Sequence, residues 1–471
     1  MIGIKGVGMT MLAQYLHGQG IEIIGSDTGE IFLTDKALNK SGIKIFGGFD
    51  IKNIPSDADL IIYSTAYNAE RNIEIKTALA GKIKVMTYAE ALGMFFNSRF
   101  GIAVCGSHGK TTTTAWLGYV LQQAGVSPST LVGSYVPQFE GAAIIGHSDY
   151  LIIEADEYQN KLRNFQPKAV LLNNIDYDHP DFFPTIDDYH QVFVEFISKI
   201  PKSGWLVANF DDEQIRKIAL VNTRAKVISY AINESADYVT YDLKSFNGEQ
   251  FFKVKMSVNE AEEGEGVDNL NLGDFKIKLL GRHNIYNALA VIAASIELGV
   301  DLTDIRRHLS EFTGTARRMQ ILGEYRGAII IDDYAHHPTE IKATIEALRQ
   351  KYPAERLTVI FHPHTFTRTK ALIDDFTKSF KHVDELIMLD IFGSAREKQG
   401  GVSSLELVEK IRIWNQEMGI GNQKIKHIPG LEKVEEYLRE NIERGDVVVT
   451  MGAGDVYKIG ERLISGSDIY D

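Results

Sequence analysis

The chain has 471 residues, of which 44% are apolar and 24% charged; this composition is typical of a globular protein, and the length suggests about three domains. Its formal net charge of -13 and its lack of long lysine or arginine runs argue against nucleic acid as a partner. Its single cysteine, Cys105, excludes an intramolecular disulfide. Because there is no signal-peptide pattern and no apolar stretch long enough for membrane insertion, we expect a cytoplasmic protein.

The first segment, residues 1–98, is expected to be a Rossmann-like domain of the α/β class. Short apolar runs at 21–25, 43–46 and 60–63 alternate with helical patterns, which predicts a parallel sheet with crossover helices. The chain starts almost directly at a glycine-rich turn, residues 3–8. We therefore expect either an unusually short first strand or a natural chain that begins several residues earlier.

The second segment, residues 99–317, is expected to form a central domain on a parallel sheet. The apolar runs that predict its buried strands lie at 100–105, 150–153 and 169–172. Apolar and polar residues then alternate at 251–258 and 275–280, which predicts a small antiparallel extension. The acidic stretch between them, residues 259–273, is predicted to be a solvated hairpin loop.

The third segment, residues 318–471, is expected to be a second Rossmann-like domain. The apolar runs that predict its strands lie at 328–331, 357–361, 385–389 and 446–450. Helical segments separate these runs, which again favours a parallel sheet.

The strongest local motif is a glycine-rich loop between a predicted strand and a helix that opens at Thr112. It consists of Gly106, Ser107, His108, Gly109, Lys110 and Thr111. Such a loop directs backbone N–H groups and a helix N-terminus at phosphates, while the lysine neutralises charge and the threonine can bind Mg²⁺. We interpret it as the site of a nucleoside triphosphate. The alternative is a turn that only packs helix on strand, and the GxxGKT spacing is shorter than in a generic Walker-type NTPase.

A second group of polar residues follows two predicted strands. Glu154 begins the sequence EADE after one strand, and His179 ends the sequence NIDYDH after the other. Because we expect these strands to be neighbours, the carboxylate and the imidazole should reach the edge that carries the glycine-rich loop. Thr111 and Glu154 suit Mg²⁺, whereas His179 could also orient a water or a substrate. In the alternative interpretation, the carboxylates cap helices and the histidine bonds to backbone.

A third set of residues is ambiguous by itself. Asn284 and Asn287 open an alanine-rich helix, Arg318 follows another arginine, and Asp333 begins the sequence DYAHHP. Asn284 could be a helix cap, and adjacent arginines are usually solvated. Spacing alone assigns these residues no role.

Eight motifs occur in the order seen in the Mur ligases, the amino-acid ligases of peptidoglycan-precursor synthesis. They are GSHGKTTTT, EADE, NIDYDH, GRHNIYN, TARRM, DDYAHHPTE, HPHTFTRT and GAGDVY. The chain resembles this family from about Gly3 to Gly454, and most of all its members that join L-alanine to UDP-N-acetylmuramate. The resemblance implies a UDP-binding N-terminal domain, a central ATPase domain and a C-terminal domain that brings the amino acid.

The resemblance also implies roles for individual residues. Catalysis would depend on Lys110, His179, Arg318 and Asp333. ATP would be bound by Gly106, Ser107, His108, Gly109, Lys110, Thr111, Thr112, Asn284, Asn287, Arg318 and Asp333. Mg²⁺ would be held by Thr111 and Glu154, with support from His179. Substrates would be bound by Gly6, Gly8, Met9, Asp27, Ser64, His336 and His337, with His364 and Arg368 helping to receive the amino acid.

The implied reaction proceeds through an acyl-phosphate. With ATP and Mg²⁺, the carboxylate of UDP-N-acetylmuramate attacks the γ-phosphate, and the neutral amine of L-alanine then attacks the activated acyl group. Because water would hydrolyse that group, we expect the C-terminal domain to close on the central domain when nucleotide binds.

Four residues depart from the family pattern and leave the accepted amine open. Lys5 replaces a usual glycine, Phe49 falls where the family often has histidine, Tyr158 follows EADE in place of serine, and Thr365 stands where arginine is usual. The alternatives are a recycling ligase that attaches a tripeptide to UDP-N-acetylmuramate, an NAD-binding oxidoreductase and a non-catalytic scaffold. The oxidoreductase would use the N-terminal glycine-rich turn, but it leaves the GSHGKT loop without a role.

Overall fold

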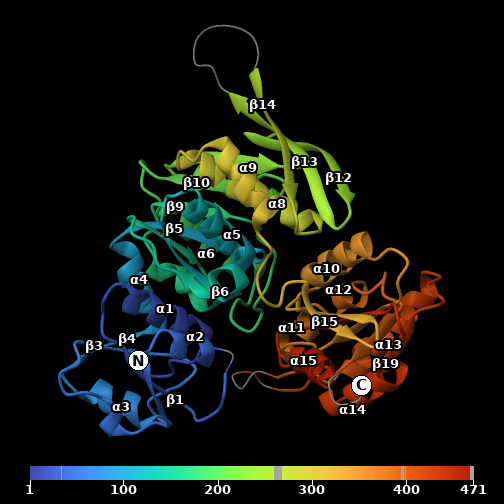
Figure 1. Ribbon diagram of the computed structural model, residues 1–471, viewed down its shortest axis with the longest axis horizontal. Helices are drawn as coiled ribbons and strands as arrows, with labels where there is room; N and C mark the ends of the chain where they lie inside the picture. The colour runs from blue at the N-terminus through green and yellow to red at the C-terminus, as the bar shows by residue number, and fades with distance from the viewer. Residues whose placement is uncertain (33, 259–267, 394–396, 398, 467–471) are drawn as a thin grey trace.

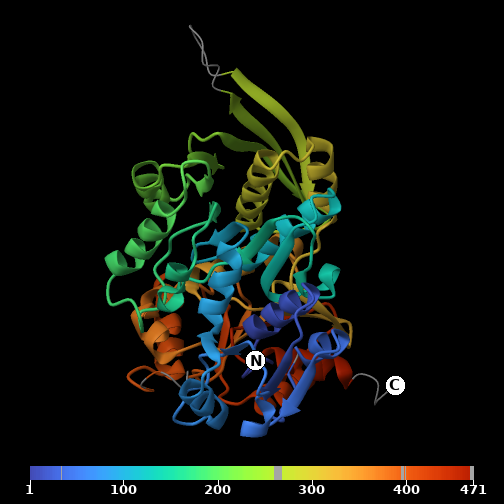
Figure 2. The same ribbon diagram turned by 90° about the vertical axis from the view of Figure 1, so that its left-hand side faces the viewer.

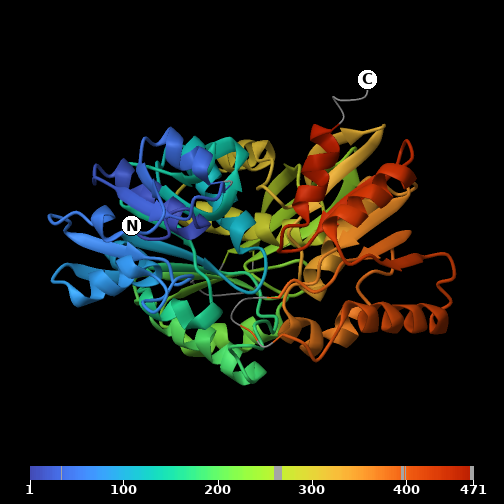
Figure 3. The ribbon, with the colours of Figure 1, turned by 90° about the horizontal axis from the view of Figure 1, so that it is seen from below.

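The computed structural model describes residues 1–32, 34–258, 268–393, 397 and 399–466. In these ranges the chain forms three successive α/β blocks, which we call the N-terminal, central and C-terminal blocks (Figure 1). The N- and C-terminal blocks lie side by side below the central block, whose long strands β12, β13 and β14 project at the top (Figures 1 and 2). Viewed from below, these two blocks flank the middle of the molecule (Figure 3).

The N-terminal block contains two parallel strand pairs. Its strands are β1 (Ile24–Asp27), β2 (Lys44–Gly47), β3 (Leu60–Tyr63) and β4 (Lys84–Thr87). Its helices are α1 (Val7–Gly18), α2 (Asp35–Lys40), α3 (Ile73–Ala80) and α4 (Tyr88–Asn97), with a 3₁₀ turn at Ile51–Asn53. Ile2 lies between the pairs and forms parallel bridges to Ser26 of β1 and Tyr63 of β3. The expected parallel sheet is therefore confirmed, and a single bridging residue takes the place of its first strand.

The central block is built on a ten-stranded sheet with the order β14-β13-β12-β11-β10-β9-β5-β8-β6-β7. Its strands are β5 (Phe100–Cys105), β6 (Ser129–Val136), β7 (Gly141–Ile144), β8 (Tyr150–Glu154), β9 (Ala169–Leu172), β10 (Trp205–Asn209), β11 (Lys226–Ala231), β12 (Tyr238–Phe246), β13 (Glu249–Val258) and β14 (Asp268–Ile277). Its helices are α5 (Lys110–Gln123), α6 (Ile186–Ser198), α7 (Glu213–Asn222), α8 (Arg282–Glu297) and α9 (Leu302–Glu311), with 3₁₀ segments at Pro137–Phe139 and Tyr158–Asn164. In sheet order, the strands from β12 to β6 run parallel, and β13 and β14 form the expected antiparallel extension. At the other edge, β7 pairs antiparallel with β6.

Both faces of the central sheet are buried, which explains its nearly continuous apolar strands. Ile102 and Val104 of β5 pack with α5, α8 and α9, whereas Ala103 and Cys105 point to the opposite face. That opposite face is covered by α6 and α7 of the central block together with α1 and α4 of the N-terminal block. The N-terminal block is therefore packed directly against the central sheet.

Four predictions for the central block were wrong in detail. The strands that carry Glu154 and His179, β8 and β9, are not neighbours, because β5 lies between them and pairs with both. Residues 268–273 belong to β14 rather than to a loop, since they pair with β13, while 259–267 lie outside the described residues. Helix α5 begins at Lys110, two residues earlier than expected, and β14 ends at Ile277 rather than 280.

The C-terminal block is a six-stranded sheet with the order β15-β16-β20-β17-β18-β19. Its strands are β15 (Gln320–Tyr325), β16 (Ala328–Asp333), β17 (Leu357–Phe361), β18 (Glu385–Met388), β19 (Lys424–His427) and β20 (Val447–Met451). Its helices are α10 (Pro338–Lys351), α11 (Phe366–Ala371), α12 (Ile373–Thr377), α13 (Ser404–Glu417), α14 (Leu431–Asn441) and α15 (Tyr457–Ser465). Five strands run parallel, and four of them were predicted. The other, β19, was not predicted, nor was β15, which pairs antiparallel with β16 at the edge. None of the helices within the described residues has the length and apolar character that crossing a membrane requires.

Candidate active site

The glycine-rich loop joins β5 to α5 with its backbone folded tightly. Gly106 and Gly109 have φ angles of 127° and 78°, in the region that glycine tolerates best. A Cβ atom at Gly106 would lie 2.8 Å from the backbone oxygen of Asn174, and one at Gly109 would lie 2.6 Å from Asn287 Oδ1. Both glycines are needed for this approach, which exposes the N-terminus of α5 to a bound anion.

Lys110 is held inside the loop by a buried carboxylate. Its Nζ donates to the backbone oxygens of Gly106 at 2.6 Å and Ser107 at 3.0 Å, and to Glu157 Oε2 at 2.8 Å. Burial opposes the ammonium, but Glu157 and the nearby acids outweigh this effect and raise the pKa of Lys110. Glu157 has only 1% of its surface exposed. It was visible in the sequence as the last acid of EADE, but no role was predicted for it.

Thr111 and Glu154 lie together, as a shared magnesium site requires. The Thr111 hydroxyl donates to Glu154 Oε1 at 2.9 Å, and the Gly133 backbone N–H donates to Oε2 at 2.9 Å. Burial raises the pKa of Glu154, although Lys110 partly offsets the effect. The pair offers two oxygen donors beside the phosphate loop, which is the chemistry that Mg²⁺ prefers.

His179 belongs to a separate group of side chains. Its Nε2 lies 3.4 Å from Glu157 Oε1, and its ring packs on Tyr158 with 4.5 Å between the centroids. His179, Asp156 and Glu157 could together hold a metal ion. Glu157 of this group bonds to Lys110, which directly precedes Thr111 in the chain.

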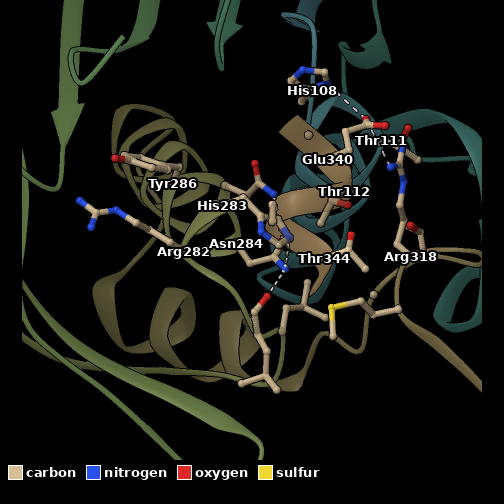
Figure 4. Close-up of a pocket in the computed structure, with 18 of the residues that line it drawn as sticks. His108, Thr111, Thr112, Arg282, His283, Asn284, Tyr286, Arg318, Glu340 and Thr344 are labelled. Carbon is tan, nitrogen blue, oxygen red and sulfur yellow. Dashed lines mark hydrogen bonds and ion pairs between the residues drawn. The ribbon is translucent and has the colours of Figure 1, made fainter. Parts of the chain in front are cut away.

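A cavity of about 850 Å³ lies between the central and C-terminal blocks (Figure 4). The predicted ATP-site residues that line it are His108, Gly109, Thr111, Thr112, Asn284, Asn287, Arg318 and Asp333. Asn284 and Asn287 come from the first turns of α8, and Asn287 Nδ2 donates to Asn284 Oδ1 at 3.0 Å. The structure thus brings together residues whose spacing in the sequence carried no information about their proximity.

Three polar atoms in the cavity wall are buried and lack a hydrogen-bond partner in the part of the chain that the structure describes. They are Asn173 Oδ1, His283 Nδ1 and Thr315 Oγ1. Buried polar atoms are normally paired, so these atoms are suited to the polar groups of a bound ligand. The cavity volume also falls in the range of small-molecule and cofactor sites.

The adjacent residues Arg317 and Arg318 have different surroundings. Arg317 Nε lies 2.8 Å from Asp332 Oδ2, and its guanidinium lies between the rings of Tyr334 and Tyr457. Arg318 instead lines the cavity, with Nη1 3.5 Å from Glu340 Oε1. Only Arg318 is therefore placed to meet a ligand, while Arg317 stabilises the start of the C-terminal block.

Asp333 ends β16 at the cavity wall. It accepts hydrogen bonds from the backbone N–H groups of Met319 at 2.7 Å and Ala335 at 2.8 Å. Burial raises the pKa of Asp333 to about 6, although Arg318 favours the carboxylate. The residue fixes the segment that carries Arg318 as well as lining the site.

His108 connects the phosphate loop to the C-terminal block. Its Nε2 lies 2.9 Å from Asp176 Oδ2, and its Nδ1 lies 3.2 Å from Glu340 Oε1. Burial opposes the imidazolium, but the hydrogen bonds to Asp176 and Glu340 outweigh it and raise the pKa of His108 to about 9. Figure 4 shows His108 and Arg318 converging on Glu340 from the two blocks. Sequence reasoning assigned no role to Asp176 or Glu340.

The predicted amino-acid site lies at a second contact between these blocks. Arg368 donates to both oxygens of Asp178, and it lies beside His364, whose Nδ1 is 3.3 Å from Arg368 Nη1. The centroids of the His336 and His364 rings lie 6.0 Å apart. Burial lowers the pKa of His336 to about 3 and that of His364 to about 4, so both are neutral at physiological pH. His337, which was predicted to bind substrate without a more specific role, caps α10 by accepting from the Thr339 backbone N–H.

The predicted UDP-site residues form a group of their own in the N-terminal block. Gly6 is the N-cap of α1, and Gly8 approaches the Tyr88 ring so closely that a Cβ would lie 2.9 Å from it. Asp27 accepts from the backbone N–H of Lys5 at 2.7 Å and from the Tyr67 hydroxyl at 2.8 Å.

The two remaining members of this group are Met9 and Ser64. The Met9 side chain is buried in the core with α4, so only its backbone could face a substrate. Ser64 follows β3, and its backbone N–H donates to the Ile2 oxygen at 2.9 Å.

The four departures from the family pattern have local explanations. Lys5 Nζ lies 3.2 Å from Asp35 Oδ1, and the Phe49 ring packs on Tyr67 with 4.9 Å between the centroids. Tyr158 packs on His179, and Thr365 caps α11 by accepting from the Arg368 backbone N–H at 3.4 Å. Each substituted residue is thus integrated into the fold.

Comparison with known proteins identifies the family. Three family models match in succession: the Mur ligase family catalytic domain at residues 1–100, the Mur ligase middle domain at 104–295, and the Mur ligase glutamate ligase domain at 317–454. A UDP-N-acetylmuramate–L-alanine ligase of Desulfitobacterium hafniense strain Y51 is 38% identical over 465 residues, which cover 98% of each chain. The chain belongs to the Mur ligase family. A protein of the same name from Alkaliphilus metalliredigens is also 38% identical, over 99% of this chain and 96% of its own.

Solved Mur ligases share the fold. The UDP-N-acetylmuramate–alanine ligase of Thermotoga maritima superposes with a TM-score of 0.76 at 24% identity, covering 100% of this chain and 99% of its own. A murein peptide ligase of Psychrobacter arcticus superposes with a TM-score of 0.71 at 23% identity, covering 98% and 97%. At these identities the likeness concerns the fold alone, and it confirms the three-part α/β architecture expected for a Mur ligase.

Proposed function

We propose that this Mur ligase is the ATP-dependent enzyme that joins L-alanine to UDP-N-acetylmuramate in peptidoglycan-precursor synthesis. The observation that carries the proposal is one cavity lined by His108, Gly109 and Thr111 of the glycine-rich loop, together with the two asparagines of α8, Arg318 and Asp333. The relatives at 38% identity over nearly the whole chain, which carry the name of this reaction, support the choice of substrates.

We assign the three steps of substrate handling to three domains. Residues 1–98 would bind the UDP portion, residues 99–317 would bind ATP, and residues 318–471 would bring L-alanine. The N-terminus of α1 after Gly6 would present backbone N–H groups to the diphosphate, and Asp27 would accept hydrogen bonds from the uridine portion. The group of His336, His364 and Arg368 would receive the amino acid.

The described residues fit both ATP and Mg²⁺. The unpartnered atoms of Asn173, His283 and Thr315 would bind polar groups of the nucleotide, and the loop at the start of α5 would bind its phosphates. Thr111 and Glu154 would hold Mg²⁺, which offsets charge on the transferring phosphoryl group. His179 would support the reacting groups from the side of Glu157.

In this reaction the UDP-N-acetylmuramate carboxylate would take the γ-phosphoryl group of ATP, with ADP as the leaving group. The L-alanine amine would then attack the acyl-phosphate and release inorganic phosphate. Lys110 would exchange part of its contact with Glu157 for phosphate oxygens, since its ammonium already lies within the loop. Arg318 would stabilise developing negative charge from the side of the C-terminal block. The buried contacts between the two blocks would exclude water from the activated acyl group.

The experiment that tests this function is a panel assay of ADP release by the purified chain. Each reaction contains ATP, Mg²⁺ and UDP-N-acetylmuramate with L-alanine, glycine, L-serine or the tripeptide. We expect ADP release that depends on UDP-N-acetylmuramate and is fastest with L-alanine. Release only with the tripeptide would identify a recycling ligase. No ATP turnover together with NAD-linked absorbance change would identify an oxidoreductase.

A further inference from the structure

Three side chains from distant parts of the chain converge where the central block meets the C-terminal block. His108 comes from the phosphate loop, Asp176 follows β9, and His337 precedes α10. His108 Nε2 lies 2.9 Å from Asp176 Oδ2, and His337 Nδ1 lies 3.5 Å from the same oxygen. One possible ligand atom from each residue lies within 4.8 Å of the others. The two separations from Asp176 Oδ2 are close to those between donors that share a small ion.

The donor set has the composition of a zinc site, and its two separations from Asp176 Oδ2 are near the spacing of one. Zinc binds histidine nitrogen and carboxylate oxygen at about 2.0 to 2.2 Å in a tetrahedron, which places neighbouring ligand atoms roughly 3.3 Å apart. Two imidazoles and one carboxylate also suit cobalt and nickel, whereas Mg²⁺ prefers oxygen donors alone. The group is therefore chemically distinct from the Thr111–Glu154 pair.

The outward nitrogens of both histidines are already bonded, as in sites built to hold a metal. His108 Nδ1 lies 3.2 Å from Glu340 Oε1, and His337 Nε2 lies 3.3 Å from the backbone oxygen of Tyr177. A carboxylate or a carbonyl in this position keeps the proton on the outer nitrogen and directs the lone pair of the inner nitrogen at the metal. Glu340 and the Tyr177 carbonyl thus hold the outer N–H of each ring, and the inner nitrogen of His108 becomes available once its proton is displaced.

We propose that His108, Asp176 and His337 form a binding site for a zinc-class divalent ion, which joins the central and C-terminal blocks. The ion replaces the proton in the His108–Asp176 hydrogen bond, and that proton is released to solvent. It also replaces two hydrogen bonds from Thr339, one from its hydroxyl to Asp176 Oδ2 at 2.6 Å and one from its N–H to His337 Nδ1 at 3.3 Å. The three protein ligands leave a fourth position for water.

The test uses the full chain, freed of metal and kept in excess Mg²⁺, titrated with Co²⁺ as a spectroscopic substitute for zinc. We expect one Co²⁺ per chain with the intense visible absorption of a four-coordinate ion. His337→Gln and Asp176→Asn should each weaken binding at least tenfold. Octahedral Co²⁺ spectra, or undiminished binding by both variants, would overturn the proposal.

Two control variants separate this site from other histidines. His427→Gln changes a histidine that pairs with Asp390 within the C-terminal block, and it should leave Co²⁺ binding unchanged. His179→Gln removes the histidine of the other candidate group and should also leave it unchanged. Loss of the signal in His179→Gln with retention in His337→Gln would assign the ion to that other group and refute the proposal.

A second measurement covers the case in which a ligand variant folds poorly. An ion bonded to side chains of two blocks stabilises the folded chain, so Zn²⁺ should raise the unfolding midpoint of the wild-type protein. The same addition should raise the midpoint of Glu340→Gln less, relative to that variant without Zn²⁺, because the change weakens the support of His108 and keeps all three ion ligands. An equal rise in both proteins would count against the geometry proposed here.

Discussion

Arg368 of α11 donates two hydrogen bonds to Asp178 of the central block, from Nε to Oδ1 at 2.8 Å and from Nη2 to Oδ2 at 3.2 Å. The two residues are 190 positions apart in the chain, and 4% and 5% of their surfaces are exposed. Burial opposes the Asp178 carboxylate, but Arg368 outweighs it and holds the pKa of Asp178 well below its usual range. This buried pair is a direct link between the blocks that enclose the cavity.

Asp178→Asn should weaken the attachment of the C-terminal block. Removing one partner of a buried ion pair leaves an uncompensated charge and costs about 3 to 5 kcal/mol. The change should lower the free energy of unfolding in urea and enlarge the radius of gyration measured by X-ray scattering. Asp374→Asn is the matched control, because its pair with Lys410 is exposed and should contribute less than about 1 kcal/mol. Equal effects of the two changes would contradict the role assigned to Asp178.

Lys110→Ala should abolish ATP turnover and also destabilise the chain. Loss of a charge-stabilising group at the phosphates lowers kcat by about 10²- to 10³-fold or more, and the buried Glu157 loses its partner. The double variant Lys110→Ala with Glu157→Gln should recover stability, measured by thermal unfolding, without recovering ADP release. Full turnover in either variant would remove the loop from the mechanism.

Thr111→Val should raise the Mg²⁺ concentration needed for half-maximal activity. The substitution keeps the side-chain shape but removes one of the two oxygens beside the phosphates, so we expect a shift of about tenfold or more. Thr114→Val is the control, because among the described residues its hydroxyl bonds only to the Lys110 backbone oxygen on the same helix. A Mg²⁺ titration of ADP release checks the result, and identical curves for both variants would exclude Thr111 as a ligand.

His283 should make the folded chain sensitive to acid. Burial lowers its pKa to about 4, with Arg318 adding to the effect, so the unfolded chain binds the proton more tightly than the folded chain. The stabilisation from the neutral imidazole is therefore complete above about pH 6.5, and it is lost as the pH falls through the folded-state pKa of about 4. The difference corresponds to at most about 3 kcal/mol.

The measurement is the free energy of unfolding of wild type and His283→Gln at several pH values between 7.5 and 4. The wild type should lose more stability than the variant over this range, because glutamine does not titrate. His336 and His364 titrate in both proteins, so the difference between the two curves isolates His283. Parallel curves would show that His283 does not contribute.

Local patterns predicted the regular parts of the fold well. The expected strand at 60–63 is observed as Leu60–Tyr63, that at 169–172 as Ala169–Leu172, and that at 357–361 as Leu357–Phe361. Each is a short apolar run that ends in polar residues, and a continuous apolar run predicts a strand buried on both faces. Residues 268–273 were predicted as a loop because they are polar, and only pairing with β13 makes them a strand.

The sequence by itself determined the family, the three α/β blocks in their order and the glycine-rich loop that leads into α5, because these depend on residues close together in the chain. The tertiary structure alone decided which polar side chains meet. In the folded chain β5 lies between β8 and β9, and Lys110 pairs with Glu157. Arg317 bonds to Asp332, whereas its neighbour Arg318 lies near Glu340 at the cavity. The physical reason is that each of these contacts joins groups brought close only by sheet order and burial, and burial then sets their charge.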